Sequence, residues 1–270
     1  MDVIINADRD LTPNGSKPLI SQGNVYSNLL HCLGYPDNIL PVAELLRQYY
    51  GLSGQWLVVS PMYWEATHNN AMIVACDQQL QLSERESRLW FAAFEEFVAH
   101  DQMTMYFHDP YTWLLQVTDK PLLTAKPVHN IVQSSLLPQL QALDSSNYWQ
   151  RFITETQMFL SAHPLNTNRE PCPINGVWLW GNGSLQPATS STILSEEPLL
   201  SIAKSLSSQV RQYQAGDGIS ANSILLLPSL APQALEDVQA KLQKQTVRWY
   251  WNNIAYTSQR LGWFSRLWRI

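Results

Sequence analysis

The sequence predicts an α/β protein in which a mixed sheet is flanked by helices and accompanied by a small α+β lobe. Short apolar segments alternate with amphipathic helical segments over much of the chain, which is typical of α/β domains. Segment 55–117 instead has a strand–strand–helix–strand–strand pattern, which is typical of a small α+β lobe. The 270 residues suit one large domain or two smaller ones. We therefore predict a core from residues 1–54 and 146–270 and a lobe from residues 55–145, with one continuous domain as the alternative.

The N-terminal quarter begins with a short strand over residues 3–6. Residues 10–24 are rich in Pro, Gly, Ser and Asn, and this composition indicates a loop. Residues 25–33 have a helical pattern that Gly34 and Pro36 end. A second helix is predicted over 41–51, because Pro41 suits a first helical turn and Gly51 suits the position after a last one.

The predicted lobe contains four strands around one helix. QWLVVS (55–60) and AMIVAC (71–76) are predicted strands. Ser83 with Glu86 three residues later forms a capping-box pattern, which opens a helix that runs to about His100. Residues 103–108 and 112–117 then predict a hairpin with Asp109 and Pro110 in its turn.

The second half of the chain returns to alternating elements. Residues 118–145 are poorly periodic, and 147–163 predict a strong amphipathic helix. Strands are predicted at 176–180 and 223–228, and helices near 197–214 and over about 231–261. Because side chains alternate along a strand, Trp178 and Trp180 should point to one side and Val177 and Leu179 to the other.

Composition excludes several classes of protein. Charged residues make up 14% of the chain, against about 25% in typical soluble domains, which favours association with partners. The net charge of −5 argues against nucleic-acid binding. Three widely spaced cysteines support neither a disulfide framework nor a zinc ribbon. We see neither a secretory signal nor an apolar run of membrane-spanning length, so a cytoplasmic location is predicted.

Short motifs give no catalytic assignment. Gly181-Asn182-Gly183 lacks the third glycine of a dinucleotide fingerprint, since Gln186 stands there, and a tight turn is the favoured interpretation. His100-Asp101 and His108-Asp109 have ordinary explanations at a helix end and in a turn. We predict neither a metal site nor a cofactor.

The segment HPLNTNREPCPINGVWLWGNG (163–183) is the most unusual loop. Pro164 ends the preceding helix, and the polar side chains that follow offer an anion or phosphate site, with Arg169 as a bidentate donor. The candidate ligand-binding residues are His163, Asn166, Arg169 and Asn175. The alternative is equally physical, because Asn and Arg side chains also satisfy backbone groups in loops. The residues alone leave the two interpretations even.

The C-terminal 30 residues contain six basic residues and no acidic residue. A helical wheel places Val247, Trp251 and Ile254 on one face with basic residues beside it. Packing on the body is favoured for 241–258, whereas for 259–270 a contact role is equally well supported. Trp and Arg are the residues that anchor interfaces, and the predicted partner-binding residues are Trp263, Phe264, Arg266, Trp268 and Arg269.

The helix and loop around 155–183 resemble a bacterial family labelled RpfE-type regulatory protein or cofactor-independent phosphoglycerate mutase-like. The residues that carry the resemblance are Glu155, Gln157, Met158, His163, Pro164, Asn166, Arg169, Glu170, Ile174, Asn175, Trp178, Trp180, Gly181 and Gly183. It extends back to about Trp56 and implies a relationship to archaeal-type phosphoglycerate mutases of the alkaline phosphatase superfamily. Those enzymes need two divalent metals and a Ser nucleophile. Apart from Asp8 or Asp10, we find no matching ligand set, so the resemblance implies a metal-free, degenerate relative.

These observations predict a non-catalytic protein that binds another bacterial protein, as a regulator or as a subunit of a larger assembly such as a secretion or signalling complex. The alternative is a metal-dependent phosphoglycerate mutase-like phosphotransferase, or a sensor of a phosphorylated small molecule. Membrane contact is expected only through the C-terminal tail, whose basic amphipathic character suits an anionic surface.

Overall fold

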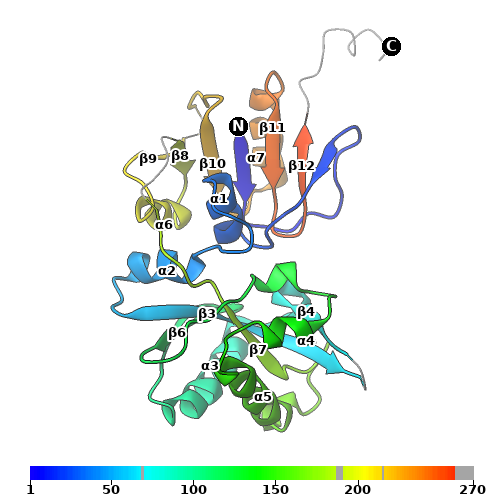
Figure 1. Cartoon of the computed structure of the whole chain (residues 1–270). Coiled ribbons are helices and arrows are strands. Elements are labelled where there is room, and N and C mark those ends of the chain that lie inside the picture. The colour runs from blue at the N-terminus through cyan, green and yellow to red at the C-terminus, as the bar shows by residue number, and fades with distance from the viewer. Residues whose placement is uncertain (68–69, 187–190, 215, 259–270) are drawn as a thin grey trace. The chain divides into compact units, whose positions relative to one another are not determined.

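The computed structural model describes residues 1–67, 70–186, 191–214 and 216–258 (Figure 1). The chain forms two compact units. Unit 1 comprises Met1–Asp37 with Leu185–Ile270, and unit 2 comprises Asn38–Ser184. Segments 38–54 and 146–184, which we predicted in the core with the N- and C-terminal parts, thus lie in the unit that contains the predicted lobe.

Unit 1 is built on a seven-stranded mixed sheet with the order β2-β12-β11-β1-β10-β8-β9. Strands β11, β1, β10, β8 and β9 run parallel to one another. Strand β12 pairs antiparallel with β11, and β2 pairs antiparallel with β12. The strands are β1 (Asp2–Ile5), β2 (Lys17–Leu19), β8 (Thr192–Ser195), β9 (Val210–Gln212), β10 (Ser223–Leu227), β11 (Val247–Tyr250) and β12 (Ala255–Ser258). The described helices are α1 (Val25–Cys32), α6 (Leu199–Lys204) and α7 (Pro232–Leu242).

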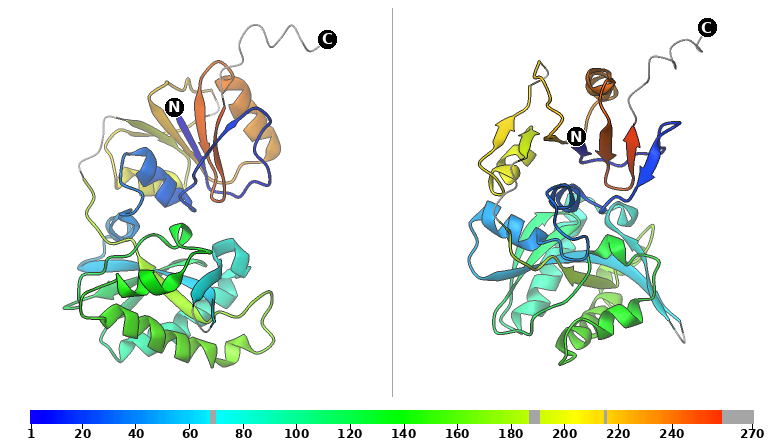
Figure 2. Two further views of the ribbon diagram at one scale, coloured as in Figure 1. Left: turned by 45° about the vertical axis from the view of Figure 1, so that its right-hand side comes forward. Right: turned by 45° about the horizontal axis from the view of Figure 1, so that its top comes forward.

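Burial explains the composition of the central strands of unit 1. Strands β1 and β10 are buried along their whole lengths and read as continuous apolar runs, as parallel strands covered on both faces do. One cluster joins Val3 and Leu225 of the sheet to Val238 and Leu242 of α7. Figure 2 shows α1 and α7 on opposite faces of this sheet.

Unit 2 contains an antiparallel sheet in which β3 pairs with β4, β6 and β7, and β6 pairs with β5. Its strands are β3 (Gln55–Ala66), β4 (Ala71–Cys76), β5 (Thr104–Asp109), β6 (Thr112–Val117) and β7 (Gly176–Trp180). Its helices are α2 (Val42–Tyr50), α3 (Glu84–Ala99), α4 (Leu136–Gln141) and α5 (Tyr148–Ser161), with 3₁₀ turns η1 (Asp77–Leu80), η2 (Val128–Asn130) and η3 (Pro164–Asn166).

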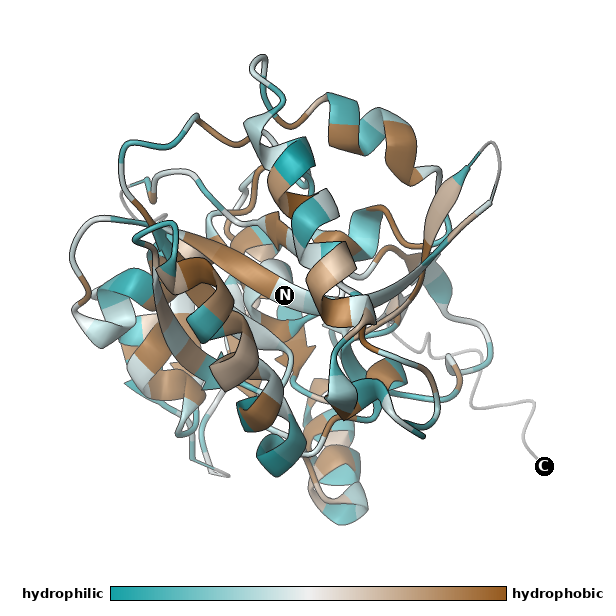
Figure 3. Ribbon diagram, turned by 90° about the horizontal axis from the view of Figure 1, so that it is seen from below, coloured by the Kyte–Doolittle hydropathy of each residue, from teal (hydrophilic) through white to brown (hydrophobic). Residues whose placement is uncertain are grey.

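Helices α3 and α5 pack side by side below this sheet in Figure 1, while α2 lies on its other face. The rings of Phe97 and Phe159 stack with centroids 4.7 Å apart, and Phe94 meets Phe152 edge-on. Both helices carry apolar and polar residues on different sides, which Figure 3 shows as adjoining brown and teal ribbon segments. The amphipathic patterns predicted for these helices are therefore used for packing against the sheet and each other.

The long strand β3 pairs with three other strands of unit 2. Val58 pairs with Leu114 of β6 and Trp180 of β7, whereas Met62 pairs with Cys76 of β4 and Gly176 of β7. Strands β4 and β6 therefore lie end to end on the same side of β3, opposite β7. The end of β4 accordingly lies near the β5–β6 turn.

Two predicted helices are wrong. The final helix over 231–261 ends at Leu242, and residues beyond it form β11 and β12. Aromatic and β-branched residues in VRWY favour strand pairing with β1, and Asn252-Asn253 provides turn chemistry. Lys241 and Arg248 consequently lie on different elements and share no helical face. The predicted helix 197–214 is reduced to α6, because Val210–Gln212 instead pairs with β8.

Within the described parts of the chain, no helix combines the length and apolar character needed to cross a membrane.

Candidate functional site

The predicted anion-binding loop is held together by its own side chains. Asn166 Nδ2 donates to the carbonyl oxygens of Leu160 and Ile174, each at 2.9 Å. Asn166 Oδ1 accepts the Ile174 N–H at 2.9 Å. His163 Nδ1 accepts from Leu165 N at 3.3 Å. These bonds join the end of α5 to the residues just before β7.

Arg169 directs its guanidinium into unit 2. Nε donates to Glu86 Oε1 at 2.6 Å and Nη2 donates to the Leu80 carbonyl at 2.6 Å, while Nη1 donates to the Cys172 carbonyl. The Arg169 side chain is only 4% exposed. All three guanidinium nitrogens already donate to protein acceptors. The bidentate face that would bind a phosphate is therefore used within unit 2.

Asn175 makes a two-point contact with β3. Its Oδ1 accepts the Trp64 N–H at 2.9 Å, and its Nδ2 donates to the Trp64 carbonyl at 2.7 Å. The side chains of His163, Asn166, Arg169 and Asn175 thus bind different parts of unit 2, and none of the hydrogen bonds described above joins two of them. Their hydrogen bonds support the structural interpretation of this loop, and an anion-binding role stays a prediction.

The predicted partner-binding residues Trp263, Phe264, Arg266, Trp268 and Arg269 lie outside the described residues.

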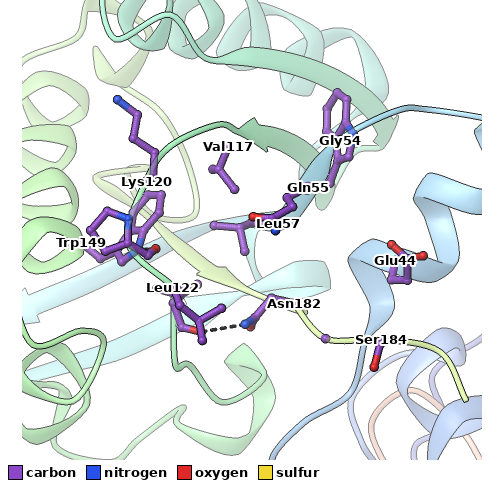
Figure 4. A pocket seen from close by; sticks show the side chains of 14 residues that line it. Glu44, Gly54, Gln55, Leu57, Val117, Lys120, Leu122, Trp149, Asn182 and Ser184 are labelled. Atoms are coloured by element: carbon purple, nitrogen blue, oxygen red, sulfur yellow. Dashed lines mark hydrogen bonds between the residues drawn. The ribbon is translucent and has the colours of Figure 1, made fainter.

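A pocket of about 340 Å³ lies in unit 2 beside the segment Gly181-Asn182-Gly183 (Figure 4). Gly181 has φ +81°, and a Cβ there would lie 2.8 Å from Val58 Cγ2. Only glycine combines this backbone geometry with so close an approach to β3, but the backbone at 181–183 bends only at Gly183 and forms no hydrogen-bonded turn, so the predicted tight turn is wrong.

The pocket walls are mostly apolar, and the polar groups around it are largely engaged. Asn182 Nδ2 donates to the Leu123 carbonyl at 2.7 Å, and Glu44 accepts from Arg47. The ammonium of Lys120 lies 5.4 Å from the centre of the Tyr148 ring. The walls include Trp56, Leu57, Val117, Leu122, Leu123 and Trp149. This chemistry suits a small apolar group with a negative end near Lys120.

His108 and Asp109 form a half-buried polar pair at the end of β5. His108 Nδ1 lies 2.7 Å from the Tyr50 hydroxyl, and His108 Nε2 lies 3.6 Å from Asp109 Oδ2. Burial lowers the pKa of His108 to about 4 and raises the pKa of Asp109 to about 6, although the Tyr111 N–H opposes the second shift. Near neutral pH, His108 is therefore uncharged. Asp109 is ionised there, and its burial carries a desolvation cost.

We expect Asp109→Asn to stabilise the protein more at pH 7.5 than at pH 4. The folded state holds the Asp109 proton more tightly than the unfolded state, whose ordinary pKa is near 3.8, so stability falls as pH rises through the window up to about 6. Asn keeps the oxygen that accepts the Tyr111 N–H at 2.8 Å but never ionises. Melting temperatures of both proteins at the two pH values measure this difference. An equal effect at both would contradict the assignment.

Comparisons with known proteins give only a distant structural likeness. No family model and no curated protein matches the chain. Among solved structures, it is similar to a cofactor-independent phosphoglycerate mutase from Thermoplasma acidophilum DSM 1728, with 12% identity and a TM-score of 0.30. The alignment covers 97% of this chain and 90% of that one. Membership of the family that the sequence resembles stays a prediction.

Proposed function

We propose that this protein acts by binding another protein, without chemistry of its own, as a regulator or a subunit of a larger bacterial assembly. The observation that carries the proposal is an apolar strip on segment 11–20 of unit 1, which we call the edge strip. Leu11 is 78% exposed and Ile20 is 75% exposed, and Leu19 on β2 adds to them. Large exposed apolar side chains mark a contact surface where they form one patch, and we propose that these three residues do so.

The edge strip belongs to a segment that is anchored at both ends. Before it, Arg9 donates from Nη1 to the Tyr256 hydroxyl at 2.8 Å, and its guanidinium lies 5.1 Å from the centre of the Trp251 ring. After it, Ser21 Oγ donates to the Trp251 carbonyl at 2.6 Å. A surface held in place loses less conformational entropy on binding than a loose loop does.

Strand pairing with a partner is not the mode that this edge favours. Strand β2 has three residues and includes Pro18, which lacks an N–H donor. Lys17 and Pro18 are typical of edges that are protected against strand addition. Side-chain contacts of Leu11, Leu19 and Ile20 therefore support the proposal better than backbone pairing does.

The C-terminal residues connect to the same edge of the sheet. Strand β12 pairs with β2, and the Trp- and Arg-containing sequence 259–270 follows directly after β12. Arg260, Arg266 and Arg269 are its charged residues, and Lys17 belongs to β2. This charge pattern fits a partner whose contact surface combines apolar and acidic residues.

We expect a tagged full-length chain, expressed at its native level, to purify with a stoichiometric partner that native mass spectrometry detects. The Leu11→Ser/Ile20→Ser double variant and a 1–258 truncation should each recover at least about tenfold less partner, since truncating apolar anchors costs more than about 1 kcal/mol each. The partner should also dissociate more readily at high salt.

Leu89→Ser/Met158→Ser is the matched control, because these residues of unit 2 are 51% and 67% exposed. This control should retain the partner. A full-length chain that stays monomeric in cross-linked cells, or equal recovery with both double variants, would contradict the proposal.

A further inference from the structure

Three side chains with metal-binding atoms converge where β4 ends. Asp77 Oδ2 lies 3.3 Å from Cys76 Sγ and 3.1 Å from His129 Nδ1. The three ligand atoms all lie within 4.8 Å of one another. Cys76 is buried, and the side chains of His129 and Asp77 are 13% and 25% exposed. The group is therefore mostly enclosed but reachable from solvent.

We propose that Cys76, Asp77 and His129 bind Zn²⁺, which clamps the connection between β6 and α4 onto the end of β4. Thiolate sulfur, imidazole nitrogen and carboxylate oxygen are the three ligand types that zinc uses in proteins. Mg²⁺ and Ca²⁺ prefer oxygen ligands alone and do not suit a thiolate. This site goes beyond the proposed function and does not depend on it.

The distances suit a cation of this size. Zinc–ligand bonds of about 2.0–2.3 Å in tetrahedral geometry separate neighbouring ligand atoms by about 3.3–3.8 Å. Asp77 Oδ2 lies 3.3 Å from Cys76 Sγ and 3.1 Å from His129 Nδ1, both close to this range, and Cys76 Sγ and His129 Nδ1 lie within 4.8 Å of each other. Three protein ligands leave the fourth tetrahedral position for a water molecule.

The charges of the group also balance. Before binding, a thiol, a carboxylate and a neutral imidazole carry one negative charge together. Zinc binding replaces the thiol proton, which passes to solvent, and the imidazole proton that Nδ1 shares with Asp77 moves to Nε2, so that Nδ1 is free to bind the cation. Thiolate and carboxylate then carry two negative charges that match the cation, so the half-buried site becomes neutral.

The backbone conformation of Asp77 also favours convergence of the three side chains. Asp77 has φ +49°, in the left-handed region that non-glycine residues rarely adopt. This conformation turns the chain sharply after β4, so that the adjacent Cys76 and Asp77 side chains converge rather than pointing to opposite sides, as they would along a continuing strand. His129 is brought to them by η2, next to Trp180, whose ring centre lies 6.5 Å away.

Cys76 is unsuited to act as a nucleophile here. Cys76 is buried, whereas catalytic cysteines have exposed sulfur. The Cys76 sulfur lies 3.3 Å from the Asp77 carboxylate, which does not take a proton from a thiol as readily as a catalytic base does. A structural cation is thus the better use of this Cys, Asp and His group.

The test uses the full chain, freed of metal with a chelator and then titrated with ZnCl₂ by calorimetry and with CoCl₂ by absorption spectroscopy. We expect one cation per chain and a thiolate-to-cobalt charge-transfer band. Cys76→Ser should abolish the band, and both Cys76→Ser and His129→Gln should weaken Zn²⁺ binding more than about 100-fold, beyond the 10–100-fold typical of outer-sphere changes. Zn²⁺ should also protect segment 118–135 from limited proteolysis.

Two matched variants control for general effects. Cys172→Ser removes another thiol, and His31→Gln disrupts another His–Asp pair, which belongs to unit 1. Both should keep the band and the affinity. If Cys76→Ser fails to fold, the same titrations are made with Asp77→Asn, which preserves side-chain shape. Absence of saturable binding, a band that survives Cys76→Ser, or a band lost in Cys172→Ser would each overturn the proposal.

Discussion

Replacing Trp178 by Ala is expected to destabilise unit 2 by about 3–5 kcal/mol, the cost typical of removing a large aromatic side chain from a core. Trp178 is fully buried on β7, and its Nε1 donates to the Lys126 carbonyl at 2.9 Å. The substitution opens a cavity and also leaves that carbonyl without its donor. Urea unfolding of the variant and the parent protein, followed by circular dichroism, measures the difference.

Leu122→Ala is the control for this measurement, because Leu122 is 79% exposed. Surface substitutions of this kind usually change stability by less than about 0.5 kcal/mol. A cost for Trp178→Ala as small as that of the control would mean that the indole is not part of the core, and the arrangement of β7 described above would be wrong.

The strand that contains Trp178 shows what a sequence pattern can predict. Trp178 and Trp180 were expected on one side of the strand, and both reach the segment 126–129, through Lys126 and His129. All five residues of β7 are nevertheless buried, because the strand is covered on both faces. Period-two alternation gives the direction of a side chain, but only the packed fold determines which sides are covered.

The final helix shows where local pattern was misleading. The spacing of apolar residues in 241–258 allowed a helical wheel, yet Val247–Tyr250 joins the sheet beside β1, almost 250 residues earlier in the chain. Register with a distant strand is a tertiary effect, and tertiary context regularly overrides local propensity. The same reason explains β9, which was predicted as the end of a helix.

The polar groups show a similar division between local and distant partners. Ser83 Oγ accepts from Glu86 N at 3.2 Å, as the capping-box pattern predicted. The Glu86 carboxylate, however, pairs with Arg169 rather than with the backbone of Ser83. Likewise, Cys76 and Asp77 meet His129 only because η2 folds back to the end of β4. No spacing motif could have indicated either convergence.

The ion pair between Arg169 and Glu86 gives the second large prediction. Arg169→Ala is expected to cost about 3 kcal/mol, at the lower end of values for breaking a buried pair, since Glu86 is 31% exposed. The variant leaves the carbonyls of Leu80 and Cys172 without their donors. Because these contacts join η1 and α3 to the loop before β7, the loss should also increase hydrogen exchange in residues 163–175.

Arg88→Ala is the matched control for Arg169→Ala. Arg88 pairs with Glu84 one helical turn away, and the two side chains are 57% and 64% exposed. Pairs of this kind contribute about 0–1 kcal/mol, so the control should be nearly neutral. If the two variants unfold at the same urea concentration, Arg169 does not hold the loop together. The structural interpretation of the loop would then lose its support relative to the anion-binding interpretation.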